Sequence, residues 1–433
     1  NGTDEAVVTA LFTKLGNTGD LAVNAKGTLV TGGELNRDIK GTNGTVKLNV
    51  ETVLANSKSI EGTLNGNGQT ISIGSGGSVD SFTVGKLAGE TNLTIDVDLS
   101  SITSDKLSIG AAESGATINL SSINITKDAG TGGTLEVPKE YTNALIYADG
   151  DGVTGVTCNV TDTGNKAVAT NSYLYEFAVG VAGKLSYTVA ATEITLKNFL
   201  ERNIVDGDND PSTLSLTADM NEEATGTAVV ANDSQGQSTI NLNGHILNAV
   251  APSLKVVVAE NKNLTIDAQD GSTVGANIVF DTKENSNLNL AGTMTLDSAV
   301  TGTGNVAVKG VVTANAAVEA GTLTVDADKT LTMASGKDLT VTDGITNNGN
   351  IAVDAGNLKA AVTNSDTAKV KLGAGTLADT SVISGGAIDI TGDVVANADA
   401  LQSSKGITVA DSGNTLSLTG GVLADKVTGA GTL

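Results

Sequence analysis

The segment TLTVDADKTLTMASGKDLTV, residues 322–341, holds three copies of one short pattern. In each copy an apolar residue, a threonine and a second apolar residue precede a polar stretch, as in LTV (323–325), LTM (331–333) and LTV (339–341). Strict alternation over so few residues predicts a short β-strand with one buried face. The Asp, Gly, Ser and Lys residues between the copies predict tight turns.

The same pattern recurs along the second half of the chain. Its spacing is about 8 residues in the tightest stretch and roughly 16 to 19 elsewhere, which is typical of coils with two or three strands separated by sharp corners. Such a coil buries its apolar face only against the coils on either side. We therefore predict an all-β fold, a parallel β-helix or β-solenoid. The further copies are LTI (264–266), LNL (288–290), VAV (306–308), IAV (351–353), VKL (370–372), IDI (388–390), ITV (407–409) and LSL (416–418).

Two other fold classes compete with the solenoid. A β-sandwich would use longer strands, more Pro in its connections and core aromatics, whereas this chain has 3 Pro, 5 Phe, 5 Tyr and no Trp. Disorder would suit the abundant Gly and the net charge of -23, but disordered chains lack the aliphatic residues that recur here every few positions. The composition favours many small aliphatic side chains in short stacked strands.

Two segments have the periodicity of a short amphipathic helix instead of a strand. After each comes a turn, a strand and, further on, an Asn-Gly corner, in LNGNGQTISI (64–73) and INLNGHIL (240–247). This order predicts two copies of the solenoid, each with a short capping helix that covers the edge of its first coil. The apolar positions are Val8, Leu11, Phe12 and Leu15 in the first helix, and Leu196, Phe199, Leu200 and Ile204 in the second.

A tyrosine-rich stretch separates the two copies. All five tyrosines and the single cysteine, Cys158, lie between residues 141 and 187, and SYLYEFAVGVAGKLSYTV (172–189) alternates as an antiparallel hairpin does. We predict a first β-helix over 1–136, a hairpin-rich junction over 137–190 and a second β-helix over 191–433. The junction is either a small subdomain with its own core or a subunit or ligand contact. The candidate interface residues are Tyr173, Tyr175, Phe177 and Tyr187.

The residue types needed for chemistry are scarce. A β-helix that cleaves polysaccharide needs clustered carboxylates with basic groups and aromatic platforms, but Trp is absent, Arg37 and Arg202 are the only arginines, and His245 is the only histidine. His245 lies in an Asn-Gly corner, where a turn residue is the simpler interpretation. The acidic balance argues against nucleic acid as a partner. We expect no catalytic residue, no cofactor and no enzymatic activity.

One acidic run has partial calcium-site spacing. Asp206, Asp208 and Asp210 alternate as at the start of an EF-hand loop, but Pro211 replaces the required Gly and Thr217 the bidentate Glu. A solvated turn is the preferred interpretation, and weak calcium binding is the alternative.

Features of export and modification add little. No stretch approaches the ~18 apolar residues of a membrane span, so no span is expected. The start at Asn1 without a signal peptide indicates a processed or excerpted segment. N-x-S/T sequons at Asn92, Asn124 and Asn263 arise readily by chance in a chain rich in Asn, Ser and Thr.

The second half resembles the β-helices of bacterial autotransporter passengers and related surface adhesins. KLGAGTL (371–377), followed by SGGAIDI (384–390), and KVTGAGTL (426–433) are similar to that family's K-x-G-x-G-T-L repeat, although its Asn-x-Tyr-x-Gly element is missing. The resemblance implies a secreted or cell-surface bacterial protein. We expect a non-catalytic structural subunit of a surface fibre or layer that assembles by self-association. The alternatives are an adhesin stalk that attaches to host or surface glycans and, as a minor case, a polysaccharide-active enzyme.

Overall fold

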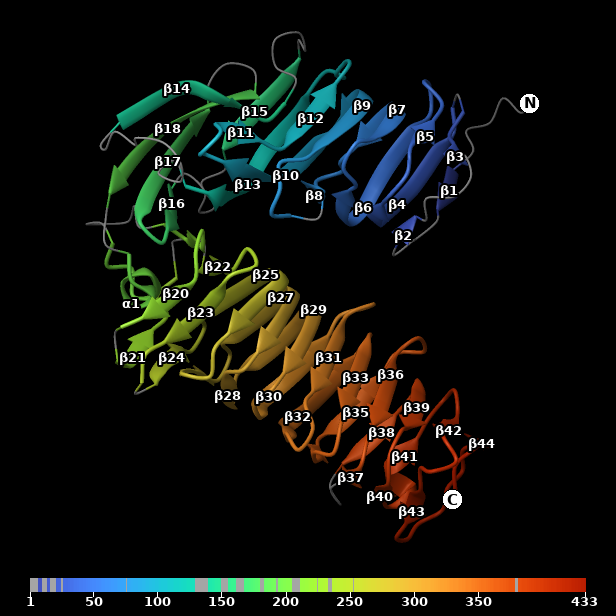
Figure 1. The fold of residues 1–433 in the computed structure, drawn as a ribbon. Coiled ribbons are helices and arrows are strands. Elements are labelled where there is room, and N and C mark those ends of the chain that lie inside the picture. The colour runs from blue at the N-terminus through green and yellow to red at the C-terminus, as the bar shows by residue number, and fades with distance from the viewer. Residues whose placement is uncertain are drawn as a thin grey trace. The chain divides into compact units, whose positions relative to one another are not determined.

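The computed structural model confirms the predicted fold class. Strands hold 61 % of the chain, in a parallel β-solenoid of about 17 turns (Figure 1). The chain forms two compact units: unit 1 is residues 1–194 and 204–217, and unit 2 is residues 195–203 and 218–433. The structure describes residues 7–9, 14–15, 21–24, 26–74, 76–128, 139–148, 155–160, 167–179, 183–191, 194–204, 211–223, 225–232, 236–251, 253–377 and 381–433.

Unit 1 contains strands β1 to β19. Their bounds are β1 (Val7–Thr9), β2 (Lys14–Leu15), β3 (Leu21–Ala22), β4 (Thr28–Leu35), β5 (Ile39–Lys40), β6 (Thr45–Leu54), β7 (Lys58–Asn65), β8 (Thr70–Ile73), β9 (Ser81–Ala88), β10 (Glu90–Asp98), β11 (Thr103–Ser104), β12 (Lys106–Ile109), β13 (Ala116–Lys127), β14 (Lys139–Ile146), β15 (Val156–Val160), β16 (Ala167–Thr170), β17 (Tyr173–Val179), β18 (Lys184–Ala191) and β19 (Thr213–Ser215).

Apolar residues from successive turns stack inside unit 1. Leu29 on β4 is in register with Val46 on β6, which is in register with Leu64 on β7, and Leu64 with Leu87 on β9. All four are buried. Each side chain therefore covers the one from the turn before it, which is how a chain with so few aromatic residues obtains a continuous core.

The prediction of a helix at the start of the chain is wrong. Val7–Thr9 pairs in parallel with β4, and Lys14–Leu15 pairs with the other end of the same strand. The helical spacing of Val8 and Leu15 is overridden because β4 offers unpaired backbone groups that an extended segment can use. Residues 10–13 lie outside the described part of the chain.

Unit 2 contains the helix α1 (Leu196–Leu200), the short 3-10 helix η2 (Ala398–Ala400) and strands β20 to β44. The strands are β20 (Met220–Glu222), β21 (Gly226–Val229), β22 (Thr239–Asn241), β23 (Ile246–Ala249), β24 (Leu254–Val258), β25 (Asn263–Val274), β26 (Ile278–Thr282), β27 (Asn287–Leu296), β28 (Ala299–Gly302), β29 (Asn305–Ala314), β30 (Val318–Val325), β31 (Thr330–Met333), β32 (Leu339–Asn347), β33 (Asn350–Val353), β34 (Leu358–Lys359), β35 (Ala361–Asn364), β36 (Lys369–Leu372), β37 (Gly375–Thr376), β38 (Val382–Ser384), β39 (Ala387–Ile390), β40 (Val394–Ala396), β41 (Leu401–Gln402), β42 (Ile407–Val409), β43 (Leu416–Leu418) and β44 (Val427–Gly429).

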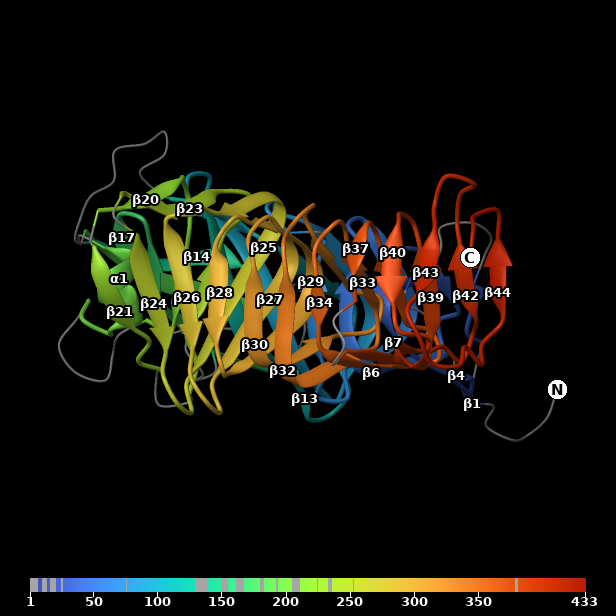
Figure 2. The same ribbon diagram turned by 90° about the horizontal axis from the view of Figure 1, so that it is seen from below.

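The apolar triplets of the sequence become the inner columns of unit 2. Met333, Val353, Leu372 and Ile390 follow one another in register, one per turn, and all are buried. Figure 2 shows strands β24, β26 and β28 of the same unit side by side, as their parallel pairing requires. The predicted parallel solenoid is therefore confirmed at the level of individual triplets.

Glycine and asparagine form the corners, as expected. Asn243 and Gly244 both have positive φ (51° and 83°) in a turn closed by the His245 N–H, which donates to the Leu242 carbonyl at 2.8 Å. A different constraint acts at Gly310: a Cβ there would lie 1.8 Å from the Gly292 carbonyl oxygen of the previous turn. Close stacking of turns thus requires glycine at this position inside β29.

The second predicted helix is confirmed as α1. Thr195 is its N-cap and accepts from the Asn198 N–H at 3.0 Å, while Leu196, Phe199 and Leu200 are buried. The helix packs on β21, at the start of the unit 2 solenoid. Only this one of the two expected capping helices is therefore present, and internal duplication stays a prediction.

Candidate functional site

The tyrosine-rich segment forms an antiparallel sheet within unit 1. Its order is β14, β18, β17, β16, and β17 pairs with β18 from Tyr173 opposite Ala191 to Val179 opposite Leu185. The predicted hairpin is therefore present. Its apolar side chains belong to one continuous cluster that runs from Val23 to Val189, so the segment has no core of its own and extends that of unit 1. This cluster continues across the expected boundary at 136/137.

Three of the four candidate interface residues are core residues, so that prediction is wrong for them. Tyr175 is 0 % exposed, Tyr187 1 % and Phe177 4 %. Alternation along the strands turns these rings toward the interior, where Tyr175 and Tyr187 have centroids 6.1 Å apart and Tyr141 stacks on Tyr187 at 4.7 Å. Tyr173 is half-buried and is the one that can still contact a partner.

A buried carboxylate anchors this sheet. Asp128 accepts hydrogen bonds from three hydroxyl groups: Thr170 at 2.9 Å, Tyr175 at 3.0 Å and Thr217 at 2.6 Å. Neutral donors of this kind satisfy a buried acceptor and fix the donors in one geometry. The Tyr175 hydroxyl therefore ties β17 to the end of β13, which is a structural role.

The hydroxyls of Tyr147 and Tyr187 and the Cys158 thiol are protonated in the neutral range. Burial raises the pKa of Tyr187 to about 12 and raises the pKa of Tyr147 further. Burial also raises the pKa of the Cys158 thiol. Because the thiolate is the nucleophilic form, Cys158 is poorly reactive at neutral pH.

The outer face of the same sheet carries a shallow groove of about 360 Å³. Its centre is a row of three residues in register across the strands, Glu140 on β14, Thr188 on β18 and Glu176 on β17. The Thr188 hydroxyl donates to Glu176 at 3.4 Å. The groove combines charged and apolar groups, as a contact surface does. Its remaining lining residues are Lys139, Leu174, Val189 and Ala190.

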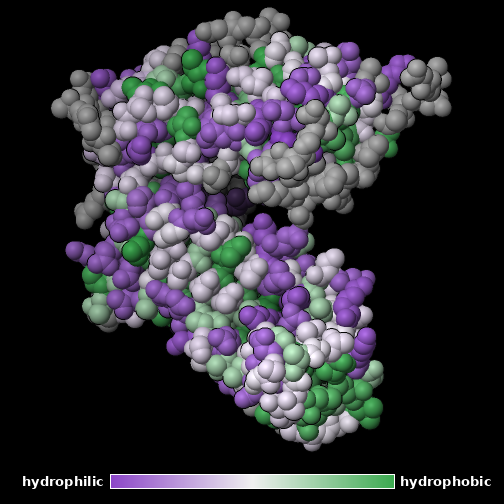
Figure 3. Space-filling model, turned by 45° about the vertical axis from the view of Figure 1, so that its right-hand side comes forward, coloured by the Kyte–Doolittle hydropathy of each residue, from purple (hydrophilic) through white to green (hydrophobic). Residues whose placement is uncertain are grey.

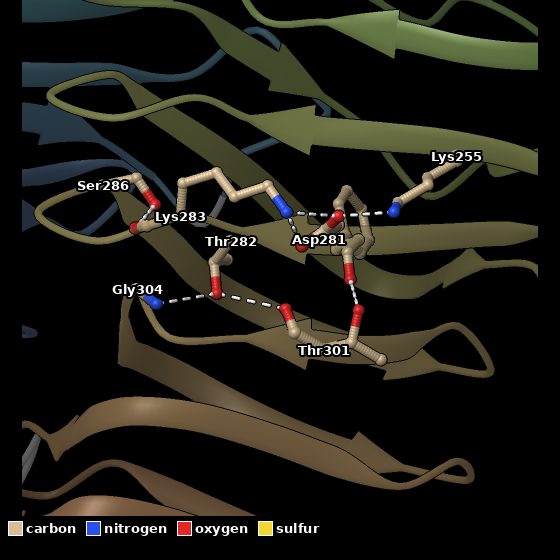
Figure 4. A network of polar contacts seen from close by, with 8 residues as sticks. Lys255, Asp281, Thr282, Lys283, Ser286, Thr301 and Gly304 are labelled. Atoms are coloured by element: carbon tan, nitrogen blue, oxygen red, sulfur yellow. Dashed lines mark hydrogen bonds and ion pairs between the residues drawn. The ribbon is translucent and has the colours of Figure 1, made fainter.

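A second polar arrangement lies on unit 2 (Figure 4). Asp281 on β26 is nearly buried and contacts the ammonium groups of Lys255 on β24 at 2.5 Å and Lys283 at 2.7 Å. Burial alone would raise the pKa of Asp281, but the two lysines lower it overall. Thr301, one turn on, donates to the Phe280 carbonyl at 3.0 Å. The network pairs charges across turns and holds the carboxylate ionised.

Asparagine side chains form a ladder along unit 2. The Asn287 amide donates to Asn263 at 2.6 Å, the Asn305 amide donates to Asn287 at 3.1 Å, and the Thr322 hydroxyl donates to Asn305 at 2.6 Å. Their register positions, one residue before each apolar triplet, could have revealed the ladder in the sequence.

The sequon asparagines use their amides in hydrogen bonds between turns. Asn263 donates to the Gly236 carbonyl at 2.9 Å, Asn92 to the Gly68 carbonyl at 2.9 Å and Asn124 to Asp96 at 3.1 Å. These three amides therefore have a structural role that the sequons did not indicate.

Of the residues singled out for catalysis and metal binding, His245 lies in the described part of the chain. His245 lies 3.6 Å from Asp219, which is 65 % exposed, in a surface turn. The nearby Ser272 hydroxyl accepts from the N–H groups of Gly244 and Gln269 and is buried. Asp206, Asp208 and Asp210 lie outside the described residues. Across the described ranges, no group of three or more His, Cys, Asp or Glu side chains is placed to hold a metal ion.

None of the helices in the described part of the chain is long and apolar enough to cross a bilayer.

Comparison of the chain with protein-family models, with curated proteins and with solved structures found no match.

Proposed function

We propose that this chain is a non-catalytic extracellular structural protein of bacteria, a subunit of a surface fibre or layer that assembles by self-association. The observation that carries the proposal is the continuity of the stacking: inner apolar columns and an outer amide ladder join each turn to the next. Side chains spent on turn-to-turn contacts make a stiff element, which suits architecture.

Charge pairing between turns supports the same role. Lys369 on β36 contacts Asp389 on β39 at 2.8 Å, and Lys359 on β34 contacts Asp338, which precedes β32, at 2.9 Å. Such pairs add cross-turn links without creating a substrate site, although exposed pairs each contribute little. They place part of the charge of the outer surface in fixed, repeating positions.

The face shown in Figure 3 does not favour unspecific association. Hydrophilic and intermediate residues make up most of the face in Figure 3, with hydrophobic atoms in smaller patches. A net charge of -23 repels like chains at low salt and keeps long β surfaces from sticking. Self-association therefore needs a local surface, and the groove over β14, β17 and β18 is the candidate that we propose.

An adhesin stalk is the second candidate function. The groove favours it as well, because Glu140, Thr188 and Glu176 offer a row of hydroxyl and carboxylate acceptors that a host or surface glycan could meet. The two roles differ in partner: another copy of the chain, or a polysaccharide on a cell.

Negative-stain microscopy of purified protein across a salt series separates the roles. Regular filaments or sheets support assembly, whereas isolated rods that bind cells or glycans support the adhesin. A Thr188→Arg variant would place a bulky charge in the groove and should abolish assembly, while a matched control on unit 2, Thr313→Arg, should assemble normally. Assembly by Thr188→Arg would exclude the groove, isolated wild-type rods at every salt concentration would refute assembly, and cleavage of polysaccharide would refute both structural roles.

A further inference from the structure

A group of three buried carboxylates lies in unit 1, next to the end of β14: the hydroxyl of Ser104, beside Asp105, donates to the Ile146 carbonyl at 3.0 Å. Asp105 is 1 % exposed, Asp96 6 % and Asp80 7 %. They come from three different places: Asp80 precedes β9, Asp96 is on β10, and Asp105 lies between β11 and β12. Asp105 is 9 residues from Asp96 and 25 residues from Asp80 in the sequence, and the turns of the solenoid bring the three together.

Asp105 holds two segments of the chain together by accepting hydrogen bonds from their backbone N–H groups. Its Oδ1 accepts the Asp80 N–H at 2.7 Å, and its Oδ2 accepts the Asp96 N–H at 2.9 Å. The main chain adds two bonds, from the Asp105 N–H to the Asp96 carbonyl and from the Lys106 N–H to the Asp80 carbonyl. One side chain thus joins the β10–β11 hairpin to the chain entering β9.

The carboxylates of Asp96 and Asp80 also bind the loop over residues 76–80. Asp96 accepts the Gly77 N–H at 2.5 Å and the Asn124 amide at 3.1 Å, and Asp80 accepts the Ser78 hydroxyl at 3.3 Å. At Gly74 a Cβ would lie 1.7 Å from an Asp80 carboxylate oxygen, so this loop closes tightly over the group. The loop over residues 76–80 is therefore held by carboxylates.

Electrostatics makes this arrangement sensitive to protons. Burial, the largest cause, and the like charges of Asp96 and Asp80 raise the pKa of Asp105 to about 8, although the two backbone N–H donors lower it. Burial also raises the pKa of Asp80. The other charged residues on the packed strands are Lys86 on β9, Glu90 and Asp98 on β10, Lys106 on β12, Lys127 on β13, and Lys139 and Glu140 on β14. Asp98 and Lys127 form an ion pair at 3.1 Å.

We propose that the Asp80–Asp96–Asp105 group is a pH-sensitive clasp, which holds the 76–80 loop and the β10–β11 hairpin together while Asp105 is protonated and releases them when that proton is lost. The bound proton removes one of three converging negative charges. Its loss to solvent leaves carboxylates that repel one another in a poorly hydrated site.

Hydrogen exchange by mass spectrometry on the whole protein tests the clasp. Between pH 6 and pH 9, after correction for intrinsic exchange with an unfolded reference, segments 76–84 and 96–106 should lose protection at least tenfold. The segment Asn287–Leu296 in unit 2 should keep its protection. The neutral variant Asp105→Asn should show no pH-dependent loss, whereas the control Asp98→Asn should behave as wild type does.

Two results would overturn the clasp: equal protection of the wild type at pH 6 and pH 9, or the same loss in Asp105→Asn. If Asp105→Asn does not fold, Asp80→Asn decides. Removing one repelling charge should move the midpoint of the transition to lower pH, and an unmoved midpoint would contradict the proposal.

Discussion

Individual polar residues in this protein join one turn to the next. Asp128 accepts hydrogen bonds from three hydroxyl groups in unit 1. In unit 2, Asn287 is hydrogen-bonded to Asn263 and to Asn305, on either side of it in the amide ladder. A buried acceptor or donor left without its partner costs more than the bond itself contributes. Substitutions at these positions should therefore act on stability.

Tyr175 gives the clearest single-residue prediction. Tyr175→Phe removes the hydroxyl that donates to Asp128 and should lower the free energy of unfolding of unit 1 by about 1–2 kcal/mol, while Tyr175→Ser should cost about 3–5 kcal/mol through the cavity it leaves. Urea denaturation followed by tyrosine fluorescence measures both. Tyr173→Phe, at the half-buried neighbour, is the control and should change stability little. Full stability of Tyr175→Ser would show that this ring is not part of the core.

The amide ladder gives a second prediction at this scale. Asn287→Ala breaks the bonds to both Asn263 and Asn305 and should destabilise unit 2 by about 1–2 kcal/mol. Asn315→Ala is the comparison, because its bond to Asp297 is exposed and should be worth less. Equal effects of the two variants in thermal denaturation would mean that the ladder adds nothing to the stacking.

At the scale of elements, the short helix α1 shows how tertiary contacts decide a structure. Five residues are too few for a stable helix in water. The buried side chain of Glu222, on β20, accepts the N–H groups of Leu196 and Lys197 at its start, and Thr195 caps it. The first predicted helix became strands because β4 pairs with that segment instead.

Removing the carboxylate should therefore unfold α1 locally. Glu222→Ala leaves two N–H groups at the helix start without their acceptor, and we expect a loss of about 1–3 kcal/mol in the stability of unit 2. Hydrogen exchange in residues 195–203 is the direct measurement. Glu223→Ala, at the exposed neighbouring position, is the matched control and should leave this segment protected. Unchanged exchange in Glu222→Ala would show that the side-chain packing of α1 suffices.

At the scale of the whole molecule, the two units should respond differently to pH. The folded pKa of Asp105 lies above its unfolded value, so its contribution to unit 1 is complete in acid and is lost as pH rises through about 8. In unit 2 the lysine partners lower the pKa of Asp281 and Asp338, so those contributions hold above the unfolded value and are lost in acid as pH falls through the lowered pKa.

Calorimetry of the whole chain should therefore show two unfolding transitions, of which only one depends on pH in this range. From pH 6 to pH 9, the free energy of unfolding of unit 1 should fall by an amount on the order of 2 kcal/mol, while that of unit 2 stays constant. In Asp105→Asn both transitions should be constant over this range. A single transition, or parallel shifts of two, would contradict independent units.

Much of the solenoid could be predicted from the sequence because its rules are local. A triplet such as IDI at 388–390 has one buried face wherever it lies, and an Asn-Gly pair such as Asn243-Gly244 closes a turn by its own backbone preferences. Repetition then leaves stacking as the way to bury those faces. Fold class, strand positions and corner residues follow from properties that each residue carries by itself.

The tertiary structure alone decided which side chains meet. The alternation of β17 was readable, but the burial of Tyr175 depends on the apolar cluster of unit 1 that lies behind it. Asp80, Asp96 and Asp105 show no motif, because the register of turns brings them together and burial sets their charge. Periodicity specifies which residues face inward, whereas packing across distant turns specifies their partners, and the chemistry of a site depends on the partners.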